Sequence, residues 1–228
     1  MTKVVLDVSM SLDGFTAGPN VRAEEPMGDG GERLHEWMAG EGADARAVEE
    51  VNAMVGATVI GRRTFDLGLR PWGGTPWPGV PSFVVTHRTE EDFRGDNGGM
   101  FYFDGLEAAV RRAKDAAGDK DVLVMGADIA GQLLVAGLLD EVHVHVAPVL
   151  LGRGTGMFGG RVGGLVLEGA PVAGAATHLR FRVRHSTIRP VKASLPTLKI
   201  GKEAFTDYAI GIRSLGNTTG TSNHSGGA

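Results

Sequence analysis

The chain contains the stretch Ala57-Thr58-Val59-Ile60-Gly61-Arg62-Arg63-Thr64-Phe65, in which an apolar run meets a glycine, two arginines and a threonine. The apolar run 57–60 predicts a buried strand, and Gly61 marks the point where its backbone turns. The arginines then supply positive charge, and Thr64 supplies a hydroxyl. Because anionic ligands of α/β sheets bind outside the carboxyl ends of strands, this segment predicts an anion site. A strand that ends in a basic surface turn is the alternative.

Further apolar runs predict a sheet that is interrupted by helices in its first part. Strands are predicted at residues 4–10, 57–60, 82–86, 100–103, 121–125, 141–151, 165–168 and 177–185. Helices are predicted at 32–38, after Asp44 as an N-cap, at 106–117 and at 129–136. Early strands alternate with helices and later strands follow one another, which is typical of a mixed α/β sheet with an antiparallel end.

The bulk composition narrows the classes of function. A hydrophobic content of 42% and a charged content of 22% are typical of a soluble globular protein. A net charge of −4 gives no reason to expect nucleic acid or an acidic membrane as a partner. The sequence has no cysteine, which excludes thiolate nucleophiles, disulfides and Cys-ligated metal sites. We find no signal-peptide pattern and no membrane-length apolar run, so a cytoplasmic location is expected.

The chain divides into two parts by composition. Residues 1–190 carry the strand and helix patterns and are expected to form one domain. From Lys192 onward no firm period remains, and Gly216–Ala228 consists mostly of Gly, Ser, Thr and Asn. Residues 191–228 are therefore predicted to be a flexible C-terminal extension.

Three more predicted strands are followed by residues suited to a ligand. These segments are Thr86-His87-Arg88, Met125-Gly126-Ala127-Asp128 and Leu12-Asp13-Gly14. A solvated turn, tight packing and a common turn pair are their structural alternatives. Taken together, three loops whose residues suit an anion favour a dinucleotide as the ligand. No acidic residue closes the second strand to hold a ribose hydroxyl, and Arg62, Arg63 and Arg88 favour the 2′-phosphate of NADPH over NADH.

Two further groups of residues, histidines and tryptophans, could offer other chemistry. His143 and His145 share a face of one predicted strand, but no carboxylate is placed convincingly beside them, so no metal site is expected. Trp37, Trp72 and Trp77 could line a pocket for a planar substrate, although loop packing is the better explanation for the last two.

Five collinear motifs resemble the dihydrofolate-reductase-like superfamily, and most closely the reductase (C-terminal) domain of bifunctional riboflavin-biosynthesis proteins and its stand-alone bacterial relatives. The motifs are Ser11–Gly14, Val59–Phe65, Val85-Thr86, Met125–Ala130 and Ala147–Gly152, within about residues 3–185. The resemblance implies a mixed, mostly parallel central sheet flanked by helices in three layers. It also implies a homodimer.

The same resemblance implies roles for particular residues. The cofactor NADPH would be held by Gly61, Arg62, Arg63, Thr64, Thr86, His87, Arg88, Gly126, Ala127, Asp128 and Ile129. Asp13 would stand near the nicotinamide as the catalytic residue. Ser11, Asp13 and Trp37 would bind the substrate.

Two departures from the family pattern bear on the substrate. Met125 stands where the family usually has a glycine, and Gly61–Asp66 differs from the usual substrate loop. We therefore expect an NADPH-dependent reductase of a small heterocyclic molecule, of the 5-amino-6-(5-phosphoribosylamino)uracil reductase type. Another pteridine, pyrimidine or carbonyl substrate is the alternative. A nucleotide-binding protein without turnover is the second hypothesis.

Overall fold

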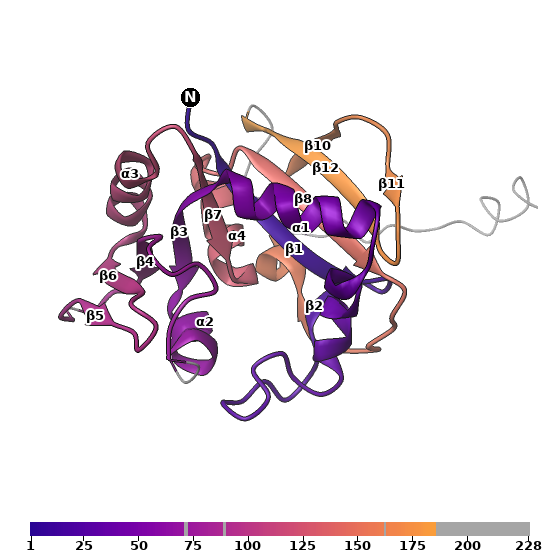
Figure 1. The fold of residues 1–228 in the computed structure, drawn as a ribbon, viewed down its shortest axis with the longest axis horizontal. Helices are drawn as coiled ribbons and strands as arrows, with labels where there is room; N and C mark the ends of the chain where they lie inside the picture. Colours follow the sequence, from indigo (N-terminus) through magenta and orange to yellow (C-terminus); the bar gives the residue numbers. More distant parts are fainter. Residues whose placement is uncertain (71–72, 89, 162, 186–228) are drawn as a thin grey trace, which may run out of the picture. The chain divides into compact units, whose positions relative to one another are not determined.

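The computed structural model describes residues 1–70, 73–88, 90–161 and 163–185, which belong to one compact unit, Met1–Pro190 (Figure 1). The predicted extension at 191–228 and Trp72 lie outside the described residues. Within the described ranges, no helix is both long and apolar enough to cross a membrane.

Strands and helices alternate in the first two thirds of the unit, and strands dominate the last third. The strands are β1 (Val4–Ser11), β2 (Phe15–Ala17), β3 (Val55–Gly61), β4 (Ser82–Val85), β5 (Phe93–Arg94), β6 (Met100–Asp104), β7 (Asp121–Met125), β8 (Glu141–Ala147), β9 (Thr155–Gly156), β10 (Gly164–Leu167), β11 (Val172–Ala173) and β12 (Thr177–Arg184). The helices are α1 (Ala43–Met54), α2 (Arg62–Thr64), α3 (Leu106–Ala117) and α4 (Ala127–Ala136), with shorter 3-10 or π segments η1 (Gly31–Ala39), η2 (Phe65–Leu69) and η3 (Met157–Gly160).

A ten-stranded sheet organises the described residues in the order β10-β12-β8-β1-β7-β3-β4-β6-β5, with β11 paired to β12. The strands from β8 to β6 in this order run parallel, whereas β12, β10 and β5 pair antiparallel with their neighbours. The predicted mixed, mostly parallel sheet with an antiparallel end is therefore confirmed. Because the central strands are parallel, the carboxyl ends of β1, β7, β3 and β4 meet at one edge of the sheet.

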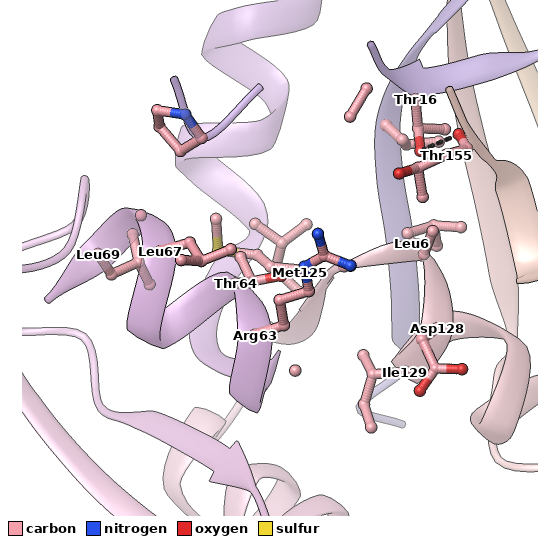
Figure 2. A pocket seen from close by; sticks show the side chains of 18 of the residues that line it. Leu6, Thr16, Arg63, Thr64, Leu67, Leu69, Met125, Asp128, Ile129 and Thr155 are labelled. Atoms are coloured by element: carbon pink, nitrogen blue, oxygen red, sulfur yellow. Dashed lines mark hydrogen bonds between the residues drawn. The ribbon is translucent and has the colours of Figure 1, made fainter. Parts of the chain in front are cut away.

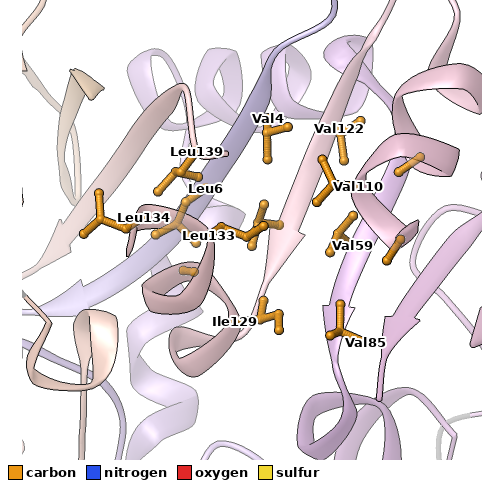
Figure 3. Close-up of a cluster of buried hydrophobic side chains, with 14 of the residues drawn as sticks. Val4, Leu6, Val59, Val85, Val110, Val122, Ile129, Leu133, Leu134 and Leu139 are labelled. Atoms are coloured by element: carbon orange, nitrogen blue, oxygen red, sulfur yellow. The ribbon is translucent and has the colours of Figure 1, made fainter. Parts of the chain in front are cut away.

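Helices cover both faces of the sheet and give the expected three layers. The main core lies between the sheet and the pair α3 and α4, and Figure 3 shows β1, β3 and β7 contributing Val4, Leu6, Val59 and Val122 to it. On α3 the residues that pack here recur with helical spacing at 109, 110, 113 and 117. The other face carries α1, whose residues share a cavity with Asp7 of β1.

The structure corrects several predicted boundaries. The helix at 106–117 and the strand at 121–125 are as predicted. The strand predicted at 141–151 ends at Ala147, because Pro148 has no N–H to continue the ladder. The loop predicted at 152–164 contains the short strand β9 and the turn η3.

The prediction that Asp44 caps a helix is wrong. The N-cap of α1 is Gly42, and Asp44 lies buried in the first turn. Its carboxylate accepts hydrogen bonds from the backbone N–H groups of Ala175 (2.8 Å) and Ala176 (3.3 Å) and lies 3.0 Å from Nε2 of His178. Asp44 therefore ties α1 to the turn before β12, a long-range contact that no local pattern reveals.

We predict that Asp44→Asn destabilises the protein by about 1–3 kcal/mol at pH 7, because it weakens charge-assisted hydrogen bonds to buried donors. Burial raises the pKa of the Asp44 carboxyl, but the backbone N–H groups and His178 outweigh this and bring it below its usual value of about 3.8. The stabilisation is therefore present above that value and is lost as the pH falls through the lower folded-state pKa.

Urea unfolding at pH 7 and at pH 3 measures this difference. Asp115→Asn is the matched control, because Asp115 is exposed on α3 and forms no hydrogen bond or ion pair with another described side chain. An Asp44→Asn protein as stable as the Asp115→Asn protein at pH 7 contradicts the assigned role.

Candidate functional site

A cavity of about 1110 Å³ lies at the edge where the carboxyl ends of the parallel strands meet. All eleven residues predicted to hold the cofactor line it: Gly61 to Thr64 after β3, Thr86 to Arg88 after β4, and Gly126 to Ile129 after β7. Figure 2 shows Arg63, Thr64, Met125, Asp128 and Ile129 around this space. The structure thus brings together three turns that are far apart in the sequence. Their roles toward a ligand stay predictions.

The turns after β3 and β7 touch each other at Gly126. This residue has φ 107°, and a Cβ there would lie 2.7 Å from Oγ1 of Thr64. Only glycine combines this backbone conformation with so close an approach. The helix α4 begins at the next residue and has no side-chain cap, so its first N–H groups and its dipole face the cavity. Although Met125 replaces a glycine that the family usually has, Gly126 beside it keeps this close contact possible.

The two arginines after β3 have different surroundings. Arg62 is held by Asp66 at 2.7 Å and by Glu90, and these carboxylates raise the pKa of its guanidinium. Arg63 is exposed and pairs with no carboxylate among the described residues. Figure 2 shows its guanidinium reaching into the space between α2 and α4. Arg63 is therefore better placed than Arg62 to meet an anionic group.

The other predicted cofactor residues form the rim of the cavity. Oγ1 of Thr86 accepts a hydrogen bond from the backbone N–H of Arg88 at 3.1 Å, which fixes the turn after β4. His87 and Arg88 are exposed on this turn. Asp128 in the first turn of α4 is paired with Arg161 at 3.0 Å, which offsets its negative charge near the cavity.

Ser11 and Asp13 are absent from the cavity wall. Oγ of Ser11 is buried and accepts the backbone N–H of Phe15 at 2.9 Å. Asp13 is exposed, and its carboxylate accepts the backbone N–H groups of Leu151 (3.1 Å) and Gly152 (2.6 Å). The hydrogen bond from Ser11, followed by these backbone donors, lowers the pKa of Asp13. This geometry favours a role in fixing the loop after β8, so the catalytic role stays an untested prediction.

Aromatic and polar groups line the cavity on the side of β1. Trp37 is buried on η1, and its Nε1 donates to Oγ of Ser9 at 2.9 Å. Trp77 also lines the cavity and donates from Nε1 to Oδ1 of Asn52 at 2.8 Å. The indole of Trp37, the hydroxyl-bearing Ser9 and the carboxylate-bearing Asp7 therefore all line this cavity.

Sequence reasoning missed a set of polar side chains on the face of the sheet under α1. Asp7 lies opposite His143 in the β1–β8 register, and Ser9 lies opposite His145, which pairs with His178 of β12. The expectation that no carboxylate accompanies the histidines is wrong, because Asp7 lies 3.1 Å from Nε2 of His145. Polar residues at 7, 9 and 11 in an otherwise apolar strand were the available signal.

These groups shift the protonation of their neighbours. Burial raises the pKa of the Asp7 carboxyl, but hydrogen bonds from His143 and His145 bring it below its usual value. Burial lowers the pKa of His143, and Asp7 and Glu141 overcome this and raise it. Among the described residues, no group of three or more such side chains has the arrangement of a metal site.

Known proteins are similar to this chain in sequence or in fold. The uncharacterized protein YyaP of Bacillus subtilis (strain 168) is 26% identical over 166 residues, which are 68% of this chain and 80% of that protein. A putative riboflavin biosynthesis protein from Shewanella sp. PV-4 superposes with a TM-score of 0.60 at 20% identity, over 81% of this chain and 99% of the other.

A pyrimidine reductase-like protein from Corynebacterium diphtheriae superposes with a TM-score of 0.56 at 15% identity, over 80% of this chain and 92% of the other. At these identities the two structures establish the fold alone. The model of the RibD C-terminal domain matches residues 2–168, which is most of the chain. The protein therefore belongs to the RibD C-terminal domain family.

Proposed function

We propose that this protein is an NADPH-dependent reductase that transfers hydride to a small heterocyclic substrate. One observation carries the proposal: three turns that the sequence predicts to bind a dinucleotide line a single cavity at the carboxyl ends of parallel strands. The family match supports the reductase class, because the motifs of this chain resemble the reductase (C-terminal) domain of bifunctional riboflavin-biosynthesis proteins.

The cofactor's phosphates fit the basic edge of the cavity. Gly126 and Thr64 bring two backbone turns together, and the N-terminus of α4 supplies N–H groups toward an anion. Arg63 and Arg88 add positive charge for the 2′-phosphate, which NADH lacks. Arg62 is engaged by Asp66 and Glu90, so we assign it to holding the turn.

The substrate fits the opposite part of the cavity, beside Trp37 and Asp7. The indole of Trp37 offers a flat surface to a planar ring, and the carboxylate of Asp7 accepts hydrogen bonds from ring N–H groups. A pyrimidine of the 5-amino-6-(5-phosphoribosylamino)uracil type has both features. The names of the Shewanella and Corynebacterium proteins agree with this class. Other pteridines, pyrimidines and carbonyl compounds remain alternatives.

In this proposal the bound cofactor supplies the hydride, and the protein orients the two reactants and excludes water. Asp13 holds the loop after β8 and is not required to touch the substrate. A homodimer and a cytoplasmic location stay predictions of the sequence.

Titration of the protein with NADPH, followed by fluorescence, tests the cofactor assignment directly. Oxidation of bound NADPH with pyrimidine, pterin and carbonyl compounds then tests turnover. We expect saturable NADPH binding and oxidation with at least one pyrimidine. Failure to bind NADPH contradicts the proposal, whereas binding without any turnover favours a nucleotide-binding protein.

We predict that Arg63→Ala weakens NADPH binding roughly 10- to 100-fold and changes NADH binding less than about threefold, because only NADPH carries the 2′-phosphate. Dissociation constants of both cofactors measure this difference. Arg111→Ala is the matched control, since Arg111 is exposed on α3 outside the cavity. Equal losses for the two cofactors contradict the assignment of Arg63 to the 2′-phosphate.

We predict that Gly126→Ala weakens NADPH binding at least tenfold, because its Cβ pushes Thr64 away and closes the approach to the cofactor. Gly118→Ala is the control, since Gly118 also has positive φ (62°) but a Cβ there meets nothing within 4 Å. Both variants lose stability through backbone strain, of roughly 1–3 kcal/mol. Similar NADPH affinity in the two variants contradicts the proposed contact.

A further inference from the structure

Four buried side chains form a continuous hydrogen-bonded row beneath α1, here called the carboxylate–histidine row: Asp7, His145, His178 and Asp44. Nε2 of His145 lies 3.1 Å from both carboxylate oxygens of Asp7. Nδ1 of His145 lies 2.7 Å from Nδ1 of His178, and Nε2 of His178 lies 3.0 Å from Oδ1 of Asp44. No side chain of the row is more than 11% exposed.

The geometry of the row fixes how many protons it holds. Each of its three contacts needs one hydrogen, because carboxylate oxygens and bare ring nitrogens only accept. Two neutral imidazoles carry one N–H each and leave one contact as two facing lone pairs. A third ring proton closes all three contacts. The three contacts therefore call for one hydrogen more than two carboxylates and two neutral imidazoles supply.

Both carboxyl ends of the row favour the ionised form. The pKa of Asp7 and that of Asp44 both lie below the usual value, since each carboxyl accepts hydrogen bonds that outweigh its burial. The ring of Trp37 lies against His145 with centroids 4.4 Å apart and edge-on to His178 at 5.1 Å. An aromatic face stabilises a cation at such distances.

Other charged groups near the row largely neutralise one another. Lys3 pairs with Glu141, Arg180 pairs with Glu50, and Asp121 accepts the backbone N–H of Lys3. On the remaining sides lie His143, beside Asp7, and His35 of η1, whose pKa is lowered by burial and then by the charge of His145. Lys3 and Arg180, the cations that line the second cavity beside the row, are therefore both paired with carboxylates.

Asp7 connects the row to two different cavities. It lines the large cavity that holds the predicted cofactor residues, and it also lines a second cavity of about 240 Å³. His143, His145 and His178 line the second cavity as well. Arg180 and Glu50 at its rim are about half exposed, so it reaches the protein surface and has room for several waters.

We propose that the extra proton of the carboxylate–histidine row is the proton delivered to the substrate, through the carboxylate of Asp7, and that the second cavity replenishes it. This inference rests on the reductase function proposed above. It makes Asp7 a catalytic residue and makes His145, His178 and Asp44 residues that hold and position the proton.

A C=N or C=O carbon of the substrate would receive the hydride that the bound cofactor supplies, and the π electron pair would move to nitrogen or oxygen. Nε2 of His145 passes its proton to the carboxylate of Asp7, and Asp7 passes that proton on to the substrate nitrogen or oxygen. The bare Nε2 then faces the carboxylate of Asp7, and this repulsion draws a proton from water in the second cavity. One hydride and one proton are consumed for each oxidised nicotinamide.

Long-range ¹H–¹⁵N NMR of the histidine rings tests the proton count without any turnover. The resonances are assigned by comparison with His145→Gln and His178→Gln proteins. At pH 7 we expect three of the four ring nitrogens of this pair to carry or share a proton. Two neutral rings overturn the proposal, and so do two fully protonated rings.

Steady-state kinetics with the substrate that oxidises NADPH tests the delivery. We expect Asp7→Asn to lower kcat about 100-fold or more and to change the dissociation constant of NADPH less than about twofold. His178→Gln keeps Asp7 but removes the shared proton, so the rate falls off at lower pH than in the unmodified protein. Asp115→Asn, an exposed carboxylate on α3, serves as the control.

The outcomes separate this inference from the proposed function. Absence of NADPH binding or of any turnover in the unmodified protein contradicts the reductase proposal, and the delivery step falls with it. Turnover that survives in folded Asp7→Asn with an unchanged pH profile overturns the delivery step alone. A row with a purely structural role lowers the stability of both variants but leaves the pH profile of the folded protein unchanged.

Discussion

The central strand β1 is the constraint on which the rest of the molecule depends. It pairs in parallel with β7 on one side and with β8 on the other, so its register fixes both halves of the sheet. Its alternate residues divide the interior, because Val4 and Leu6 enter the main core while Asp7 shares a cavity with α1 and Ser9 accepts the indole N–H of Trp37. A slip of one residue would bury the carboxylate among aliphatic side chains. The polar face and the core therefore specify the same register.

Much of the fold could be predicted because its signals are local. The helical spacing on α3 and the apolar run of β7 mark complete elements in the sequence. The same holds for the edge of the cavity: glycines, arginines and hydroxyls follow the ends of β3, β4 and β7, and parallel strands bring their carboxyl ends together. Once the strands are taken to be parallel, the sequence alone is enough to place these residues together.

The polar interior could not be predicted in this way, since its partners come from distant segments. In the sequence Asp44 has the pattern of a helix N-cap, but in the structure its carboxylate accepts hydrogen bonds from the turn before β12. His145 and His178 come together only through the antiparallel register of β8 and β12. Arg62 and Arg63 are adjacent in the sequence, yet Glu90 engages one of them from another loop. Each of these outcomes is decided by tertiary contacts rather than by residue type.

The charges of the two sides of the large cavity give a bound dinucleotide a direction. Arg63, Arg88 and the N-terminus of α4 make the edge after β3, β4 and β7 positive, whereas Asp7 makes the side under α1 negative. Phosphates are attracted to the first side and repelled from the second. In the proposed function, a cofactor held by its phosphates extends its nicotinamide toward Trp37 and Asp7, where the proposed reaction needs hydride and proton together. In the proposed function, the basic edge thus binds the phosphates, and the polar face of β1 meets the nicotinamide end.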